Sequence, residues 1–165
     1  MNVIKKGLSI IFTLVAQASL GSYKNGLKVN FYSRFTKKTH VGINANFNGI
    51  NIRGGGRVVI GDNFHSGKDI LIINSFHQYD GGDAIPYDSK NKIDKDIFIE
   101  DNVWVGDRVI ILGGVVIGEG AIIQAGSVVT SNVESCSIVG GSPAKHFKYR
   151  DIENYNVLKL NGKFI

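Results

Sequence analysis

Branched aliphatic residues recur at every sixth position of the chain from residue 93 onward. The series runs Ile93, Ile99, Val105, Ile111, Ile117, Ile123 and Val129. A second series lies two residues earlier, is apolar or small, and runs Ile97, Val103, Val109, Val115, Ala121 and Ser127. A period of six matches neither the α-helix nor the plain alternation of a β-strand. It predicts short strands joined by tight turns, with one aliphatic side chain of each strand directed inward.

Strands this short cannot bury their aliphatic side chains alone, so the repeat predicts that they stack as a solenoid. The same period is found earlier in the chain, at Ile60, Ser66 and Ile72 and at Val58, Phe64 and Ile70. It drifts out of register between residues 41 and 52. It fails between Ile72 and Ile93, which predicts a protruding loop at about 73–92. The alternative is a β-sandwich with evenly spaced strands, which the strict repeat disfavours.

The two ends of the chain differ from the repeat region. The apolar residues Ile4, Leu8 and Ile11 have helical spacing, which predicts a helical segment within residues 1–25. A secretory signal is the alternative, because basic Lys5 and Lys6 precede the apolar run, which is too short to span a bilayer. In the tail, residues 134–165, we expect either a hairpin at Asn161-Gly162 or a helix starting at Asp151. The whole chain, residues 1–165, is predicted to be one domain, with coils over 41–133.

Composition supports a chain of turns and short strands. Gly accounts for 21 of 165 residues and Pro for only 2. Hydrophobic residues at 43% and charged residues at 20% exclude a disordered chain. A single cysteine, Cys136, excludes an intramolecular disulfide or a zinc site built from several thiolates, and we expect it to be a buried thiol. The net charge of +5 favours anionic partners, but without a nucleic-acid recognition motif we expect no nucleic-acid binding.

Several short motifs resemble the hexapeptide-repeat acyltransferases. They are Val105-Gly106, Ile117-Gly118-Glu119-Gly120, Ala125-Gly126-Ser127-Val128-Val129 and, earlier, Ile60-Gly61-Asp62-Asn63. Within that superfamily the chain is most similar to the maltose, galactoside and xenobiotic O-acetyltransferases and the related polysaccharide O-acetyltransferases. That similarity rests on Asp101-Asn102-Val103-Trp104-Val105-Gly106, Ser75-Phe76-His77 and Gly141-Ser142-Pro143-Ala144-Lys145. It covers about residues 41–150.

The resemblance implies an all-β fold, a left-handed parallel β-helix. It also implies a homotrimer that binds acetyl-CoA between neighbouring subunits and needs no metal. His77 is then the general base, a role that suits a histidine with a pKa near neutrality. Its position in the loop where the period breaks fits that role, whereas an ordinary exposed loop histidine is the alternative.

Cofactor and acceptor residues follow from the same resemblance. The expected cofactor-binding residues are Trp104, Gly106, Arg108, Ala125, Gly126, Ser142, Pro143, Lys145 and Arg150. The expected acceptor-binding residues are Asn46, Asn48, Tyr79 and Asp80. Each has a structural alternative, because turns need glycine and basic tails are often merely solvated. Arg108 and Ser66 depart from the family pattern.

The other histidines are weaker candidates. We expect His65 to point outward from its strand, and His40 and His146 to lie outside the repeats. A zinc site needs three converging ligands, and the sequence gaps between His40, His65 and His77 do not stack them on one face of a coil. A metal-dependent hydratase is therefore conceivable only across subunits.

The sequence favours an acetyl-CoA-dependent O-acetyltransferase that acts on a sugar or surface-polysaccharide intermediate. One alternative is N-acetylation of an amino sugar nucleotide, and another is a non-catalytic β-helix that binds a glycan or a protein. We expect a cytoplasmic protein, and the basic, apolar N-terminus also suggests peripheral association with the inner face of the membrane.

Overall fold

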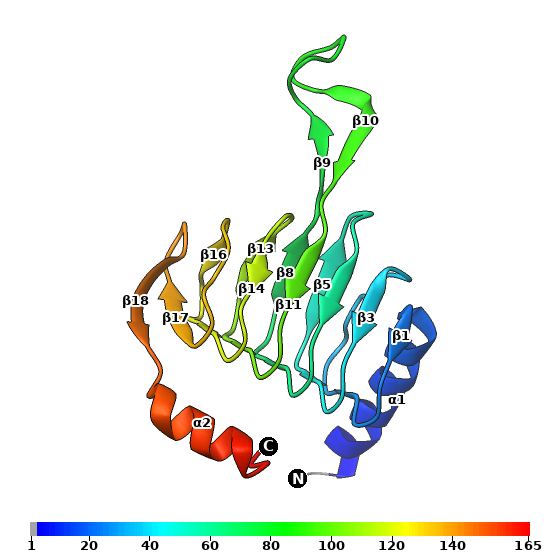
Figure 1. Ribbon diagram of the computed structural model, residues 1–165. Coiled ribbons are helices and arrows are strands. Elements are labelled where there is room, and N and C mark those ends of the chain that lie inside the picture. Colours follow the sequence, from blue (N-terminus) through cyan, green and yellow to red (C-terminus); the bar gives the residue numbers. More distant parts are fainter. Residues whose placement is uncertain (1–2) are drawn as a thin grey trace.

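The computed structural model describes residues 3–165 and shows a β-solenoid with a helix at each end and a long hairpin projecting from one edge (Figure 1). Helix α1 (Val3–Ser19) precedes the solenoid, and α2 (Ile152–Leu160) follows it. Most strands are two to four residues long, as the six-residue period predicts. The expectation of an all-β parallel solenoid is confirmed.

Three sheets form the walls of the solenoid. Sheet A contains β1 (Ser22–Tyr23), β3 (Thr39–Val41), β6 (Val58–Ile60), β11 (Ile97–Ile99) and β14 (Val116–Ile117). Sheet B contains β2 (Lys28–Val29), β4 (Asn46–Phe47), β7 (His65–Ser66), β12 (Trp104–Val105), β15 (Ile122–Ile123), β17 (Ser137–Gly140) and β18 (Lys145–Tyr149). Sheet C contains β5 (Ile50–Arg53), β8 (Ile70–Ile73), β13 (Ile110–Leu112) and β16 (Val128–Val129). The chain passes through sheets A, B and C in turn. Each strand therefore pairs in parallel with the corresponding strand of the coil before it.

The core is the ladder of inward side chains that the period predicts. Both apolar series from Ile97 and Ile99 to Ser127 and Val129 are buried, as are the earlier members at positions 58–72. Ile93 is the exception: its side chain is 39% exposed, whereas that of Ile97 is fully buried. Its place in the series was wrong, because Ile93 belongs to the projecting hairpin and not to a coil.

The second coil explains why the sequence period drifts. Buried Phe47 and Ile52 are five positions apart, and Ile52 and Ile60 are eight apart, where the regular spacing is six. The short turn passes through Gly49 at a φ of 120°. The long turn contains Gly54 at a φ of 130°, a conformation that side chains other than glycine rarely adopt. The spacings of five and eight together exceed two regular spacings of six by one residue, so the sequence period shifts by one position at this coil.

An asparagine ladder lines the corner between sheets A and B. Asn44, Asn63 and Asn102 occupy equivalent turns at φ values of 55°, 54° and 59°. The side-chain amide of each of the first two donates to the side-chain oxygen of the next, at 3.0 Å in both cases. Asparagine suits these turns because it tolerates the left-handed conformation and carries a donor and an acceptor.

The solenoid begins before residue 41 and ends after residue 133. Its first coil starts at β1 and is covered by α1, whose Thr13 Oγ1 accepts a hydrogen bond from the Val29 amide at 3.0 Å. At the other end, β18 runs antiparallel to β17. The tail then forms α2, with Asp151 as N-cap, so the helical alternative for the tail is the correct one. Among the described residues, no helix is long and apolar enough to cross a membrane.

The predicted protruding loop is a two-stranded antiparallel hairpin, formed by β9 (Ser75–Gln78) and β10 (Asp88–Asp94). It leaves the solenoid after β8 in sheet C and returns before β11 in sheet A. At its base the Asn74 carbonyl accepts a hydrogen bond from the Lys95 amide at 2.9 Å. The hairpin therefore projects from the corner between sheets C and A, opposite sheet B.

Candidate active site

His77 lies in β9 of the projecting hairpin. Its ring stacks on Tyr87, with centroids 4.2 Å apart and an interplanar angle of 19°. Its backbone is paired with Lys92 on the returning strand. The ring is partly buried, and its Nδ1 has no hydrogen-bond partner among the described residues. The imidazole is thus held by stacking, and the protein leaves Nδ1 without a proton donor or acceptor.

The acceptor candidates Tyr79 and Asp80 lie just beyond His77 and are exposed. The Asp80 carbonyl accepts a hydrogen bond from the Gln78 side chain at 3.1 Å. On the returning strand, buried Asp88 accepts a hydrogen bond from the Lys90 amide at 2.8 Å. The returning strand of the hairpin is therefore held by hydrogen bonds of its own, and the side chains that follow His77 are exposed to solvent.

A row of outward-facing side chains crosses sheet B. Asn46 is paired with His65, and His65 is paired with Trp104, on three successive coils. His65 points outward, as expected. The side-chain oxygens of Asn46 and Asn48 both accept hydrogen bonds from the side-chain amide of Asn30, at 2.8 and 2.9 Å. These two acceptor candidates are therefore held by a third asparagine that the sequence did not single out.

A cavity of about 360 Å³ lies over this part of sheet B and is covered by α2 and the C-terminal residues. Its lining comprises Asn63, His65, Asn102, Val103, Trp104, Arg150, Tyr155, Leu158, Lys159, Lys163, Phe164 and Ile165. Trp104 and Arg150, both predicted to bind the cofactor, meet here. The Arg150 guanidinium carbon lies 5.4 Å from the centre of the Tyr155 ring, and its Nε is buried without a hydrogen-bond partner.

Helix α2 is held over the cavity by a polar cluster on Glu119. The carboxylate accepts a hydrogen bond from the Tyr155 hydroxyl at 2.7 Å and pairs with the Lys159 ammonium at 2.5 Å. Burial alone would raise the pKa of Glu119, but the bonds from Lys159 and Tyr155 outweigh it and lower this pKa. Burial and the bond to Glu119 raise the pKa of Tyr155. The cluster matters because α2 contributes no buried residue of its own.

Four other cofactor candidates lie at the corner between sheets B and C. A Cβ on Gly106 would stand 2.6 Å from the Ala125 amide nitrogen, so this glycine is required for coil stacking. Gly126 has open space around it and a φ of 74°. Arg108 also has a positive φ, 56°, and its side chain is exposed. This corner is separate from the cavity under α2.

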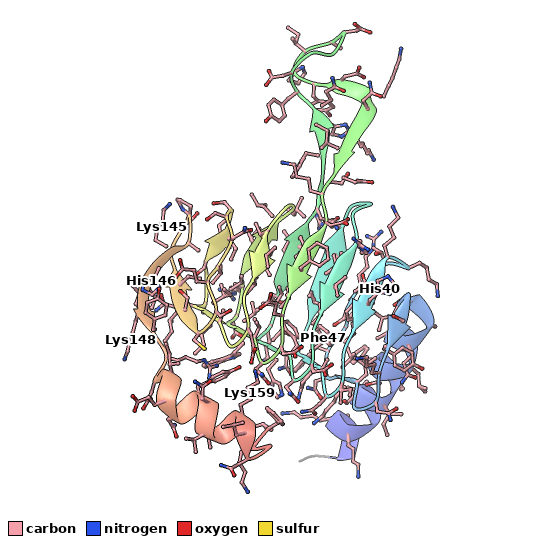
Figure 2. All side chains as sticks on the ribbon, in the orientation of Figure 1. His40, Phe47, Lys145, His146, Lys148 and Lys159 are labelled. Carbon is pink, nitrogen blue, oxygen red and sulfur yellow. The ribbon has the colours of Figure 1, made fainter. Side chains whose placement is uncertain are left out.

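The remaining cofactor candidates lie at the last coil. Ser142 and Pro143 form the exposed turn between β17 and β18, and Lys145 begins β18. Lys145, His146 and Lys148 follow one another along this terminal strand (Figure 2). The structure therefore spreads the predicted cofactor residues over three regions instead of one.

No metal site is formed by the described part of the chain, where no three His, Cys, Asp or Glu side chains group around a common point. His40 lies in β3, within the solenoid and not outside the repeats as expected, and is bonded to the Ser22 hydroxyl of the first coil at 2.8 Å. His146 is bonded to the Ser137 hydroxyl at 2.6 Å, at the opposite end of the solenoid (Figure 2). Cys136 is buried, and burial raises the pKa of its thiol, which does not favour a nucleophilic thiolate.

Within one chain, His77 and the cavity lie apart. The hairpin projects from one edge of the solenoid, and α2 runs along the opposite edge (Figure 1). The sequence did not indicate that Tyr155, Lys159 and Lys163 approach Trp104. The only usable signal was the basic character of the tail, because their contact with sheet B depends on a long-range return of the chain.

Residues 96–131 match the family described as bacterial transferase hexapeptide (six repeats). This segment covers β11 to β16 and the two buried series. Together with the solenoid fold, this match shows that residues 96–131 carry the hexapeptide repeat of bacterial transferases.

Solved structures of similar fold agree with this assignment. A hexapeptide-repeat acetyltransferase from Vibrio cholerae, complexed with acetyl coenzyme A, is 28% identical, with 82% of this chain and 74% of that chain covered and a TM-score of 0.68. A maltose O-acetyltransferase from Clostridium difficile is 25% identical over 90% of this chain and 85% of its own, with a TM-score of 0.70. A galactoside acetyltransferase in complex with coenzyme A is 23% identical, with 92% of this chain and 82% of that chain covered. Its TM-score is 0.70, and at this identity it supports the fold alone. No match is found among curated proteins.

Proposed function

We propose that this hexapeptide-repeat acyltransferase transfers an acetyl group from acetyl-CoA to a hydroxyl of a sugar or surface-polysaccharide intermediate. The observation that carries the proposal is the placement of His77. Its imidazole is stacked on Tyr87, its buried Nδ1 has no hydrogen-bond partner among the described residues, and it lies on a hairpin projecting from a solenoid whose structural neighbours include acetyltransferases. The maltose O-acetyltransferase among them supports a sugar hydroxyl as acceptor.

His77 acts as the general base in this mechanism. Acetyl-CoA supplies an acyl group that is already activated as a thioester, so no covalent enzyme intermediate is needed. The imidazole takes the proton from the acceptor hydroxyl as its oxygen forms a bond to the acyl carbon, and the carbon–sulfur bond then breaks. Tyr87 keeps the ring plane fixed by stacking. The proton held on the imidazole is available to the leaving thiolate.

The residues under α2 fit coenzyme A chemically. Arg150 and Lys163 carry positive charge suited to phosphates, whereas Lys159 is paired with Glu119, and the exposed face of Trp104 suits an apolar or flat group. The buried Arg150 Nε is a donor that finds no acceptor in the part of the chain that the structure describes. Asn46 adjoins this region through His65 and is proposed to bind the acceptor.

The active site is proposed to form between copies of the chain, in a homotrimer. His77 lies beyond the corner opposite sheet B, so one chain does not bring it to the Trp104 cavity. A neighbouring copy placed beside sheet B supplies the hairpin instead. Because acetyl-CoA is a cytoplasmic metabolite, we also propose that the reaction occurs in the cytoplasm.

The test is thiol release from acetyl-CoA across a panel of mono- and oligosaccharides, with matched amino sugars. We expect His77→Ala to lower the rate by ~10²–10⁴-fold while coenzyme A binding is retained, because general-base assistance is lost. His40→Ala is the matched control and should keep its activity. Full activity in His77→Ala would reject the assignment of the base. Turnover with amines alone would replace O-acetylation by N-acetylation.

A further inference from the structure

Helix α1 exposes its large apolar side chains. Leu8, Ile11, Leu14 and Val15 share its outward side and are all substantially accessible. These residues recur with helical spacing and form a continuous stripe. A helix that merely caps a solenoid would be expected to turn such a stripe toward the core.

The side of α1 that faces the protein is small and largely polar. Ser9 and Thr13 contact the backbone of Val29 in the first coil, with the Ser9 hydroxyl donating to its carbonyl at 3.2 Å. Ala16 is fully buried, and Phe12 packs partly against the core. These contacts fix the rotation of the helix, so its apolar stripe is held outward by the fold.

Charge is distributed very unevenly along the solenoid. Residues 1–61 contain nine lysine and arginine residues and no aspartate or glutamate, and the first acidic residue is Asp62. The rest of the chain contains ten basic and fourteen acidic residues. Because a solenoid places sequence segments in order along its axis, the end that carries α1 is strongly positive. Lys5 and Lys6 belong to α1 itself.

Aromatic side chains complete this surface. Tyr23 and Tyr32 belong to the first coil, which α1 covers, and both are exposed, whereas the ring of the neighbouring Phe31 lies against Lys68, with the ammonium 4.9 Å from the ring centre. Tyrosine and other amphipathic rings are favoured at the boundary between lipid and water. We define the N-terminal end surface as the outward side of α1 together with Tyr23 and Tyr32.

We propose that the N-terminal end surface docks on an anionic lipid bilayer. Helix α1 lies in the interface with its apolar stripe among the acyl chains, and the basic residues around it contact anionic headgroups. A soluble polyanion such as nucleic acid would leave the apolar stripe without a role. A symmetric contact with a second copy would bring two surfaces without acidic residues face to face, and like charges oppose that. The inference does not depend on the proposed acyl transfer.

The test is flotation of the full chain with vesicles of phosphatidylcholine, alone or mixed with phosphatidylglycerol. We expect flotation with the mixed vesicles only. Replacing Lys5 and Lys6 by glutamine should weaken binding by about tenfold or more, since each basic residue near an anionic surface is worth about fivefold. The matched control replaces Lys90 and Lys92 of the hairpin and should bind as the wild type does.

A second variant tests the apolar stripe. Leu8→Gln, Ile11→Gln and Val15→Gln together should abolish flotation, and glutamine keeps the helical propensity. The control is Val157→Gln with Leu160→Gln, since both residues are exposed on α2. Equal binding to neutral vesicles, absence of binding, or binding that survives the stripe variant would each overturn the proposal. The proposal would also be overturned if the stripe variant dissociated the protein into smaller assemblies and left its binding to vesicles unchanged.

Discussion

At the scale of single residues, the stacking of Tyr87 on His77 is the contact that orients the proposed base. We expect Tyr87→Ala to lower kcat by about 2–10-fold, because an aromatic pair is worth about 0.5–1.5 kcal/mol. Tyr87→Phe keeps the ring and should restore the rate. The measurement is kcat for thiol release in both variants. Equal loss in the phenylalanine variant would show that the hydroxyl matters instead of the stacking.

Asn63 combines two functions in the asparagine ladder, a left-handed turn and two side-chain hydrogen bonds. Asn63→Gly removes only the bonds and should destabilise the protein by about 1–3 kcal/mol. Asn63→Ala should cost about 1 kcal/mol more, because alanine disfavours a positive φ. Denaturant unfolding of the two variants measures the difference. Equal stabilities would mean that the turn relaxes to a negative φ in the alanine variant.

At the scale of elements, the inward ladder carries the stability of the coils. Ile117→Ala should lower the free energy of unfolding by about 2–5 kcal/mol, since it leaves a cavity in the middle of the ladder. Ile93→Ala is the matched change on the hairpin and should cost less than about 0.5 kcal/mol. Thermal unfolding distinguishes them. A large effect at Ile93 would place that residue back in the core.

Helix α2 is expected to loosen in acid. The lowered pKa of Glu119 means that its ionised form favours the docked tail. This stabilisation is present above the unfolded pKa of about 4.3 and is lost as pH falls through the lower folded value. Trp104, the only tryptophan, lies under the tail, so acrylamide quenching of its fluorescence should rise over that interval.

Glu119→Gln tests the cause of this acid transition. It removes the charge that pairs with Lys159, so quenching in this variant should already be high at neutral pH and change little in acid. Glu134→Gln is the control, because its carboxylate bonds to Tyr149 away from the cavity lining. Unchanged quenching of the wild type across the acid range would show that other contacts hold the tail.

At the scale of the whole molecule, a site shared between copies predicts complementation. Co-expressing His77→Ala and Trp104→Ala chains should recover about a quarter of wild-type activity. In a closed ring built from equal amounts of both chains, that fraction of interfaces combines two intact halves. The measurement is thiol release by the mixture against each variant alone. Activity no higher than that of the separate variants would place the complete site within one chain.

The sequence was sufficient to predict the regular coils because each repeat meets the same surroundings. Val105 and Ile123, for example, occupy equivalent buried positions in successive coils. The turns before and after Ile52 differ in length, so the six-residue period does not reveal the earlier coils. His77 became a candidate because Ser75-Phe76-His77 resembles the family motif and lies where the period fails. The cavity could not be found this way, because residues such as Lys163 reach sheet B only when the tail folds back.

The hairpin that carries His77 is an insertion whose two ends meet. Asn74 and Lys95 are hydrogen-bonded at its base, and β8 and β11 pair with the neighbouring coils on either side of it. Changes of length or sequence between these two residues therefore leave the pairing of the coils intact. Evolution or an engineer can therefore exchange this segment as a module, and the surroundings of His77 can change on a scaffold that stays the same.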